Sequence, residues 1–315
     1  SVQRALDFLE THPGEEAYIL VRPGIYQERV TIRVPGVTIF GKNREEAGNT
    51  VLTLGLGGRE LLEDGKKRGT FRTYTCLVDA ADVTLRHLTI ENSAGPGTEA
   101  GQAIALYADG HRLTVDSCRL LGWQDTLFTA PLPPKEIEKD GFVGPKQFAP
   151  RENRKQYYKH CYIEGEVDFI FGGATAWFEH CTFFSKDVNR EVKGYVTAPS
   201  TPEDVKFGYV MEDCLFAGNC PEQTVFLGRP WREWGKTVLL RCEIGPHIKA
   251  AGWDDWGKKG AHETCFFAEF QCTGPGAEDS RRPSWVHRLS EKEALCYTKD
   301  QVLDDPSVQG RQWYL

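Results

Sequence analysis

The sequence has no long apolar run: nowhere among its 315 residues do eighteen apolar residues follow one another. A transmembrane helix needs about 20 such residues, so neither a membrane span nor a membrane partner is expected. Positive charge is also scarce, because 38 Lys and Arg stand against 45 Asp and Glu and leave a net charge of −7. Nucleic-acid-binding domains are typically basic, so nucleic acid is not expected as a partner.

Cysteine is plentiful, but the spacings of metal sites are missing. The chain has ten cysteines and no Cys-x-x-Cys pair, so neither a metal nor a cofactor is expected. Five cysteines share one context, in which the cysteine and the apolar residue two positions later would lie on one face of a strand. We interpret them as small buried hydrophobes stacked in a ladder: Cys118, Cys161, Cys181, Cys214 and Cys242.

Stacked free thiols suit a reducing compartment. The first ten residues also lack the basic, apolar and small-residue order of a signal peptide. Together these features predict a cytoplasmic location, with secretion as the alternative.

Long helices are missing too. Residues 2–9 have the apolar spacing of one short amphipathic helix, and from residue 18 to 270 the pattern is of short strands broken by Gly, Asn, Asp or Pro. Alternating βα folds are therefore disfavoured. From Cys161 to Cys265 the marked cysteines recur at irregular intervals of 20 to 33 residues, which is typical of a solenoid with inserted loops. We expect an all-β fold, a single right-handed parallel β-helix domain over residues 1–315, with a β-propeller as the alternative.

Two segments stand outside this pattern. Residues 131–156 are charged and Pro-rich at both ends, and we expect one inserted surface loop that overhangs the site. Residues 275–315 are predicted to form three parts. Residues 275–289 are a polar linker, a short helix with a capping box of Ser290 and Glu293 follows, and a tail ends the segment. The helix and tail are expected to cover the open end of the solenoid.

Two aspartates in apolar surroundings have matching positions. Asp125 follows Cys118 by seven residues, and Asp168 follows Cys161 by the same distance. If the cysteines are equivalent points of neighbouring coils, the two carboxylates point the same way, about 4.8 Å apart. Two carboxylates that close separate their pKa values, so one is expected to serve as an acid while the other stays ionised.

Five segments in this order resemble the signature set of the pectin methylesterases, carbohydrate esterase family 8. They are GIYQE at 24–28, QAIAL at 102–106, QDTL at 124–127, DFIFG at 168–172 and LGRPW at 227–231, and the resemblance extends over nearly the whole chain. It implies an enzyme that hydrolyses the C6 methyl ester of galacturonate units in pectin or methylated oligogalacturonides. Methanol is released and no metal takes part. Tyr26 and Glu28 of the first segment are interpreted as mostly structural.

The resemblance also implies a role for each catalytic residue. Asp168 matches the nucleophile, and Asp125 matches the acid that protonates leaving methanol and then the base that activates water. Gln102 and Gln124 match the pair that stabilises the oxyanion, and neutral amides suit this because they leave the nucleophile charged. Arg229 matches the residue that holds the nucleophile ionised, as an adjacent guanidinium does.

The substrate contacts implied by the resemblance are Trp231, which would stack on a sugar ring, with Thr70 and Phe171 beside it. A weaker echo of the family pattern at 252–256 adds Trp253 as a further substrate contact. Tryptophan is more often core filler than ligand platform, so a purely structural role is the alternative for Trp231 and Trp253.

The sequence departs from the family pattern at two places. The spacing from Asp125 to Asp168 exceeds one coil, and the excess matches the loop at 131–156. This leaves substrate access, chain-length preference and processivity open. Trp123 stands where the family usually has tyrosine, a change expected to be tolerated.

Two other functions remain as alternatives. A polysaccharide lyase or hydrolase could use the same β-helix, but a lyase needs clustered calcium-binding carboxylates, and none stands near Arg229 in the sequence. A non-catalytic carbohydrate-binding solenoid is disfavoured because every catalytic position is intact. The expected partner is pectin or imported methylated oligogalacturonide, bound by a monomer.

Overall fold

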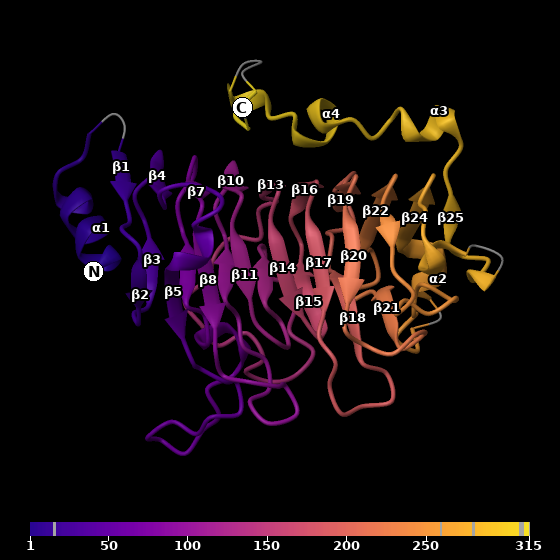
Figure 1. The fold of residues 1–315 in the computed structure, drawn as a ribbon, viewed down its shortest axis with the longest axis horizontal. Helices are drawn as coiled ribbons and strands as arrows, with labels where there is room; N and C mark the ends of the chain where they lie inside the picture. The colour runs from indigo at the N-terminus through magenta and orange to yellow at the C-terminus, as the bar shows by residue number, and fades with distance from the viewer. Residues whose placement is uncertain (15–16, 259, 279–280, 309–311, 315) are drawn as a thin grey trace.

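The computed structural model describes all residues except 15–16, 259, 279–280, 309–311 and 315. In this part of the chain, short strands wind into a parallel β-helix, as the sequence predicts (Figure 1). The first sheet consists of β1 (Ala17–Leu20), β4 (Val37–Phe40), β7 (Thr84–Arg86), β10 (Leu113–Asp116), β13 (Lys155–Lys159), β16 (Thr175–Glu179), β19 (Tyr209–Glu212), β22 (Lys236–Leu240), β24 (Phe266–Phe270) and β25 (His287–Arg288).

Two further sheets complete each coil, and every ladder between successive coils is parallel. The second sheet is β2 (Gly24–Tyr26), β5 (Thr50–Leu54), β8 (Thr89–Asn92), β11 (Arg119–Leu121), β14 (Tyr162–Gly165), β17 (Thr182–Ser185), β20 (Leu215–Gly218) and β23 (Glu243–Ile244). The third, which carries the site, is β3 (Val30–Ile32), β6 (Cys76–Val78), β9 (Leu106–Ala108), β12 (Leu127–Thr129), β15 (Val167–Gly172), β18 (Gly194–Pro199) and β21 (Val225–Gly228).

Ladders of apolar side chains fill the interior of the coils. One ladder in the second sheet runs through register-matched, buried residues: Leu52, Ile90, Leu120, Ile163, Phe183, Phe216 and Ile244. Each such side chain contributes about 1.5–3 kcal/mol when it leaves water. The repeated ladder therefore fixes the register of the coils, and with it the positions of the residues that the third sheet presents outward.

The cysteine ladder exists, but it lies at the corner between the first and second sheets, just before the strands. The residue ahead of each cysteine turns the chain with a positive φ, for example His160 at 51° and Asp213 at 51°. From Cys161 onward, each thiol of the ladder donates to a carbonyl of the preceding coil, as Cys161 does to Val115 at 3.2 Å. The ladder continues at Cys272, which follows Gln271 with a φ of 49°, so the expectation that Cys265 marks this coil is wrong.

The N-terminal end of the solenoid is closed by α1 (Val2–Thr11), whose Val2 and Leu6 are buried in the main core. The carboxylate of Glu28 accepts hydrogen bonds from the backbone N–H groups of Val2 and Gln3, which fixes the start of this helix. Glu28 thus has the structural role expected for it. No described helix, α2 (Ala261–Thr264) included, is long and apolar enough to cross a bilayer.

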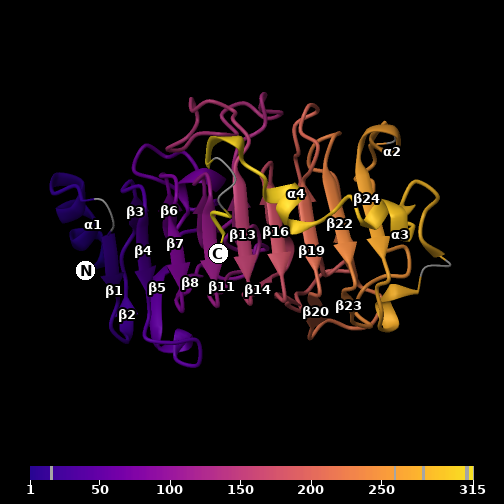
Figure 2. The same ribbon diagram turned by 90° about the horizontal axis from the view of Figure 1, so that it is seen from above.

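The C-terminal segment does not cover the open end as expected. The capping box of Ser290 and Glu293 does start a helix, α3 (Glu291–Ala294). The chain then runs back along the outside of the first sheet, where α4 (Lys299–Leu303) packs on β13 and β16 (Figures 1 and 2). An apolar surface on that sheet, which includes Trp177 and Val210, attracts Val302 and Leu303 and explains the detour. The expected linker and tail also include residues 279–280, 309–311 and 315, which lie outside the described residues.

Candidate active site

Asp125 and Asp168 lie at equivalent positions of neighbouring coils, as their equal distance from a cysteine predicts. Strands β12 and β15 pair Leu127 with Ile170, and the backbone N–H of Asp125 donates to the carbonyl of Val167 at 3.0 Å. Both aspartates have positive φ, 65° and 50°, a region that Asp tolerates better than most residues. Such strain at two stacked positions is typical of functional sites.

A fixed guanidinium holds one carboxylate of the pair. Arg229, which follows β21 in the third sheet, donates to Asp168 through Nε at 2.9 Å and through Nη2 at 2.7 Å. The guanidinium is itself sandwiched between two rings, 3.8 Å from the centroid of Tyr195 and 3.6 Å from that of Trp256. Bidentate pairing and stacking both require arginine and leave Asp168 a single orientation.

Burial and nearby charges together set the pKa values of the two carboxyl groups. Both are 7% exposed, and burial raises the pKa of each. The negative charge of Asp168 raises the pKa of Asp125 further, to well above its usual range, whereas Arg229 opposes the rise of the pKa of Asp168. The expectation that Asp168 keeps a low pKa is therefore not met, but the order of the two groups is as expected: Asp125 is the more readily protonated.

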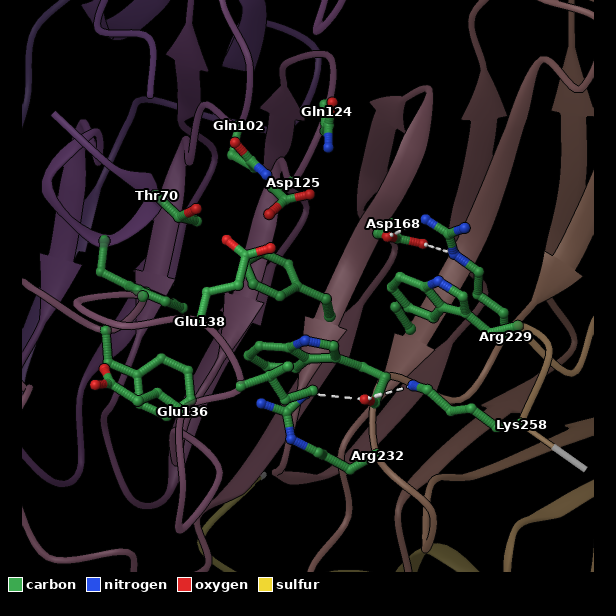
Figure 3. Close-up of a pocket in the computed structure, with 18 residues that line it drawn as sticks. Thr70, Gln102, Gln124, Asp125, Glu136, Glu138, Asp168, Arg229, Arg232 and Lys258 are labelled. Atoms are coloured by element: carbon green, nitrogen blue, oxygen red, sulfur yellow. Dashed lines mark hydrogen bonds and ion pairs between the residues drawn. The ribbon is translucent and has the colours of Figure 1, made fainter. Parts of the chain in front are cut away.

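Gln102 and Gln124 line the same cavity of about 420 Å³ as the two aspartates. They belong to successive coils, joined by a hydrogen bond from the N–H of Ala103 to the carbonyl of Gln124 at 3.0 Å. Figure 3 shows both side-chain amides on the Asp125 side of the cavity, opposite Arg229. Two amide groups beside a protonatable carboxyl can donate to an oxygen that becomes negative.

An aromatic wall forms another side of the cavity. Phe171 is buried but reaches the cavity, and its ring centroid lies 5.5 Å from that of Trp231. Thr70 and Phe71 complete this wall. The structure thus brings three of the four expected substrate contacts, Trp231, Thr70 and Phe171, to one cavity with the charged pair.

Trp253, the fourth, does not belong there, and this expectation is wrong. Its side chain is 2% exposed, stacks on Phe267 with centroids 4.5 Å apart, and donates through Nε1 to Glu269 at 2.9 Å. It is a core residue at the C-terminal end of the solenoid. The motif around it does reach the site through Trp256, which lines the cavity.

Sequence reasoning missed other groups around the cavity. Lys258 lines it and donates to the carbonyls of Pro230 and Trp231, and burial lowers its pKa to about 8. No local pattern marks this lysine. Glu166 is fully buried, accepts from the N–H of Gly97, and leaves Oε2 without a partner among the described residues. It stands two residues before Asp168, and burial raises its pKa.

The segment between β12 and β13 overhangs the site, as expected of the loop at 131–156, although β13 already begins at Lys155. Its residues Glu136, Ile137, Glu138 and Phe142 line the cavity. Within the described part of the chain, no group of three or more His, Cys, Asp or Glu side chains is placed to hold a metal ion. The clustered carboxylates that the lyase alternative requires are therefore not found among the described residues.

Comparisons with known proteins all point to the same protein family. A model of the pectinesterase family matches residues 1–132 and 150–306. Pectinesterase 31 of Arabidopsis thaliana is 33% identical over 99% of this chain and 90% of its own length. Pectin methylesterase PemA from Erwinia chrysanthemi has a TM-score of 0.75 at 27% identity, with 95% of this chain and 92% of its own covered. A pectin methylesterase in complex with hexasaccharide VII matches with the same TM-score, identity and coverage.

Proposed function

This chain belongs to the pectinesterase family and hydrolyses methyl esters of pectin, and we propose that it does so through an acyl-enzyme formed on Asp168. The observation that carries this mechanism is the register-matched pair of Asp125 and Asp168 with Arg229 bound to only one of them. The arrangement supplies an ionised nucleophile and a protonated acid from one residue type.

In the first half of the reaction, a carboxylate oxygen of Asp168 attacks the ester carbonyl carbon and the carbonyl oxygen becomes negative. The amides of Gln102 and Gln124 donate to that oxygen. The tetrahedral intermediate then collapses, the carbon–oxygen bond to the methoxy group breaks, and Asp125 gives its proton to the departing oxygen. Methanol leaves, and an anhydride joins Asp168 to the galacturonate.

In the second half, Asp125 is a carboxylate and takes a proton from water. The water oxygen attacks the galacturonate carbonyl of the anhydride, and Asp168 departs as a carboxylate held by Arg229. Galacturonate is released with a free carboxyl group, and Asp125 is protonated again. Asp125 regains from water the proton that it gave to methanol, so each cycle returns both aspartates to their starting protonation states.

The substrate is a chain of galacturonate units lying across the aromatic wall. Trp231 is partly exposed beside the catalytic pair, where a flat ring can stack on a sugar. A relative binds a hexasaccharide, which supports an extended binding mode for this chain as well. That the enzyme acts as a monomer without a cofactor remains a prediction.

The cytoplasmic expectation finds no support in the comparisons. All ten cysteines are free, but eight of them are buried or lie at the corners of the coils, where packing protects thiols in any compartment. Kinship with plant pectinesterases favours the alternative, an enzyme that acts on pectin outside the cell.

The experiment that tests the function is methanol release from highly methylated pectin and from short methylated oligogalacturonides. We expect methanol release from at least one of these two substrates. The chain length that the enzyme prefers will show whether the overhanging segment limits access to the site. Binding of both substrates without methanol release would instead support the non-catalytic solenoid.

Gln102→Ala and Gln124→Ala are each expected to lower kcat by about 10²-fold, because each removes one donor to the oxyanion. KM should change much less, since the donors act on charge that develops only in the transition state. Steady-state kinetics of both variants on methylated pectin check this. A rise in KM with unchanged kcat would assign the two amides to substrate binding.

The fall of kcat on the alkaline side of its pH profile is expected to follow the deprotonation of Asp125. The first step needs this carboxyl protonated, and burial together with Asp168 raises its pKa well above the usual range. The protonated fraction falls as the pH rises through this raised pKa, so kcat should fall there too. The profile of single-turnover methanol release measures this, and a rate that stays constant into the alkaline range contradicts the acid role of Asp125.

A further inference from the structure

The segment that overhangs the site lies outside the match to the family model. The family model matches up to residue 132 and again from residue 150, so residues 133–149, here named the arm, lie outside the match. The arm is nevertheless tied to the coils. Lys146 forms ion pairs with Asp79 and, at 3.0 Å, with Asp109. Arg151, just beyond the arm, donates to carbonyls of the arm that include those of Gln147 and Ala149, both at 2.7 Å.

The base of the arm forms part of the cavity wall. Phe142 is 6% exposed and packs edge-on against Phe71 and Trp231, with centroids 5.8 and 6.3 Å apart. Because Phe142 contacts the ring proposed to stack on the sugar, the arm is held at a fixed place beside the substrate path. Contacts of this kind pre-organise a binding surface.

The tip of the arm carries an acid, an apolar residue and an acid in succession. Glu136, Ile137 and Glu138 all line the catalytic cavity, and Ile137 is 74% exposed. Figure 3 shows the carboxylate of Glu138 directed toward Asp125 and that of Glu136 at the edge. The lysines on either side of the tip, Lys135 and Lys139, do not line the cavity.

Ile137 also lines a second cavity of about 500 Å³ that shares Trp231, Arg232 and Lys258 with the first. A polymer that extends from one cavity into the other must therefore pass the tip. Three acids add negative charge to the second cavity: Glu203, Asp204 and Glu233. Two basic groups of the site, Arg229 and Lys258, lie on the opposite side of the catalytic cavity from Glu136 and Glu138 (Figure 3). Arg232 lies closer to the arm, where it donates to the carbonyl of Lys135 at 3.3 Å.

We propose that Glu136, Ile137 and Glu138 select the methylation state of the galacturonate unit that passes the tip next to the reacting one. This inference rests on the proposed function and adds a specificity to it. A methyl ester is neutral and finds an apolar partner in Ile137. A free carboxylate at the same place faces two negative charges and loses water against an apolar side chain. The enzyme therefore prefers esters whose neighbour on the arm side is still methylated.

The test compares kcat/KM on fully methylated pectin with kcat/KM per ester on randomly half-demethylated pectin. We expect the wild type to prefer the former, and Glu136→Gln/Glu138→Gln to reduce the preference by roughly three- to tenfold, the effect of two partly exposed like charges. Raising the salt concentration should reduce the preference of the wild type in the same direction. The matched control is Asp140→Asn, which removes one charge from the same arm at a residue that does not line the cavity. Asn tolerates the φ of 62° at this position.

Binding gives a readout that does not depend on turnover. Calorimetry with fully demethylated hexagalacturonate should show tighter binding to the double variant than to the wild type, by roughly threefold or more. An unchanged preference and unchanged binding in the double variant overturn the proposal, as does an Asp140→Asn effect of the same size. If the wild type releases no methanol from any pectin, the proposed function fails, while the calorimetry still decides whether the tip repels free carboxylates.

Discussion

Asp168→Asn is expected to lower kcat for methanol release by roughly 10⁴- to 10⁶-fold, the range seen when a catalytic nucleophile is removed. The amide keeps the size of the carboxylate but has no charge with which to attack the ester. KM should change less, because the aromatic wall and the two amides still bind the substrate. Methanol release by wild type and variant on the same highly methylated pectin measures the loss.

The variant also breaks the pair with Arg229, so folding has to be checked. A matched control is Asp213→Asn, since Asp213 has a φ of 51° against 50° for Asp168 but lies at a surface corner beside Arg241. This control should keep full activity and melt within a few degrees of the wild type. If Asp168→Asn is folded and retains more than about 1% of wild-type kcat, the nucleophile is another group.

The sequence predicted the coils well because their signals are local and repeated. Strand segments and cysteines recur from coil to coil, and the helix at the N-terminus has a short-range apolar pattern of its own. The register of Asp125 and Asp168 followed from equal distances to Cys118 and Cys161, since equal steps from equivalent corners end at stacked positions in a parallel β-helix. Twenty-odd inserted residues do not change this, because the insertion begins after β12 and ends before β13.

The predictions that proved wrong concern features that local sequence patterns do not determine. Trp253 and Trp256 stand three residues apart in one motif, and the positive φ of 55° at Trp256 helps turn that ring outward while Trp253 packs inward. Nothing in the local sequence distinguishes the two. The path of α4 along the first sheet depends on an apolar patch assembled from distant strands. The raised pKa of Asp168 likewise depends on how deeply the assembled coils bury it.

Arg229→Ala is expected to lower kcat/KM by about 10³-fold under mildly acidic conditions, for two reasons. The guanidinium opposes the rise in the pKa of Asp168 that burial causes, more strongly than Lys258 does, so its removal raises that pKa further and leaves less of the carboxylate ionised. Its two hydrogen bonds also hold Asp168 in one orientation, and a misplaced nucleophile alone can cost about 10²-fold.

The two causes have different pH dependence, which makes the prediction sharp. The first part of the loss should recover as the pH rises through the new pKa of Asp168, because a carboxylic acid becomes ionised there. The second part should not recover. The same rise in pH deprotonates Asp125, so the active pH range of the variant should be narrower than that of the wild type and begin at higher pH.

Arg229→Lys keeps the charge but loses the bidentate pair and the stacking on Tyr195 and Trp256, so its activity should be intermediate. Arg241→Ala, at an exposed pair with Glu212 and Asp213, is the control and should leave the profile unchanged. A profile of Arg229→Ala parallel to that of the wild type at every pH would mean that Arg229 binds substrate without keeping Asp168 ionised. Lys258, whose charge also lowers the pKa of Asp168, would then be the group that favours its ionised form.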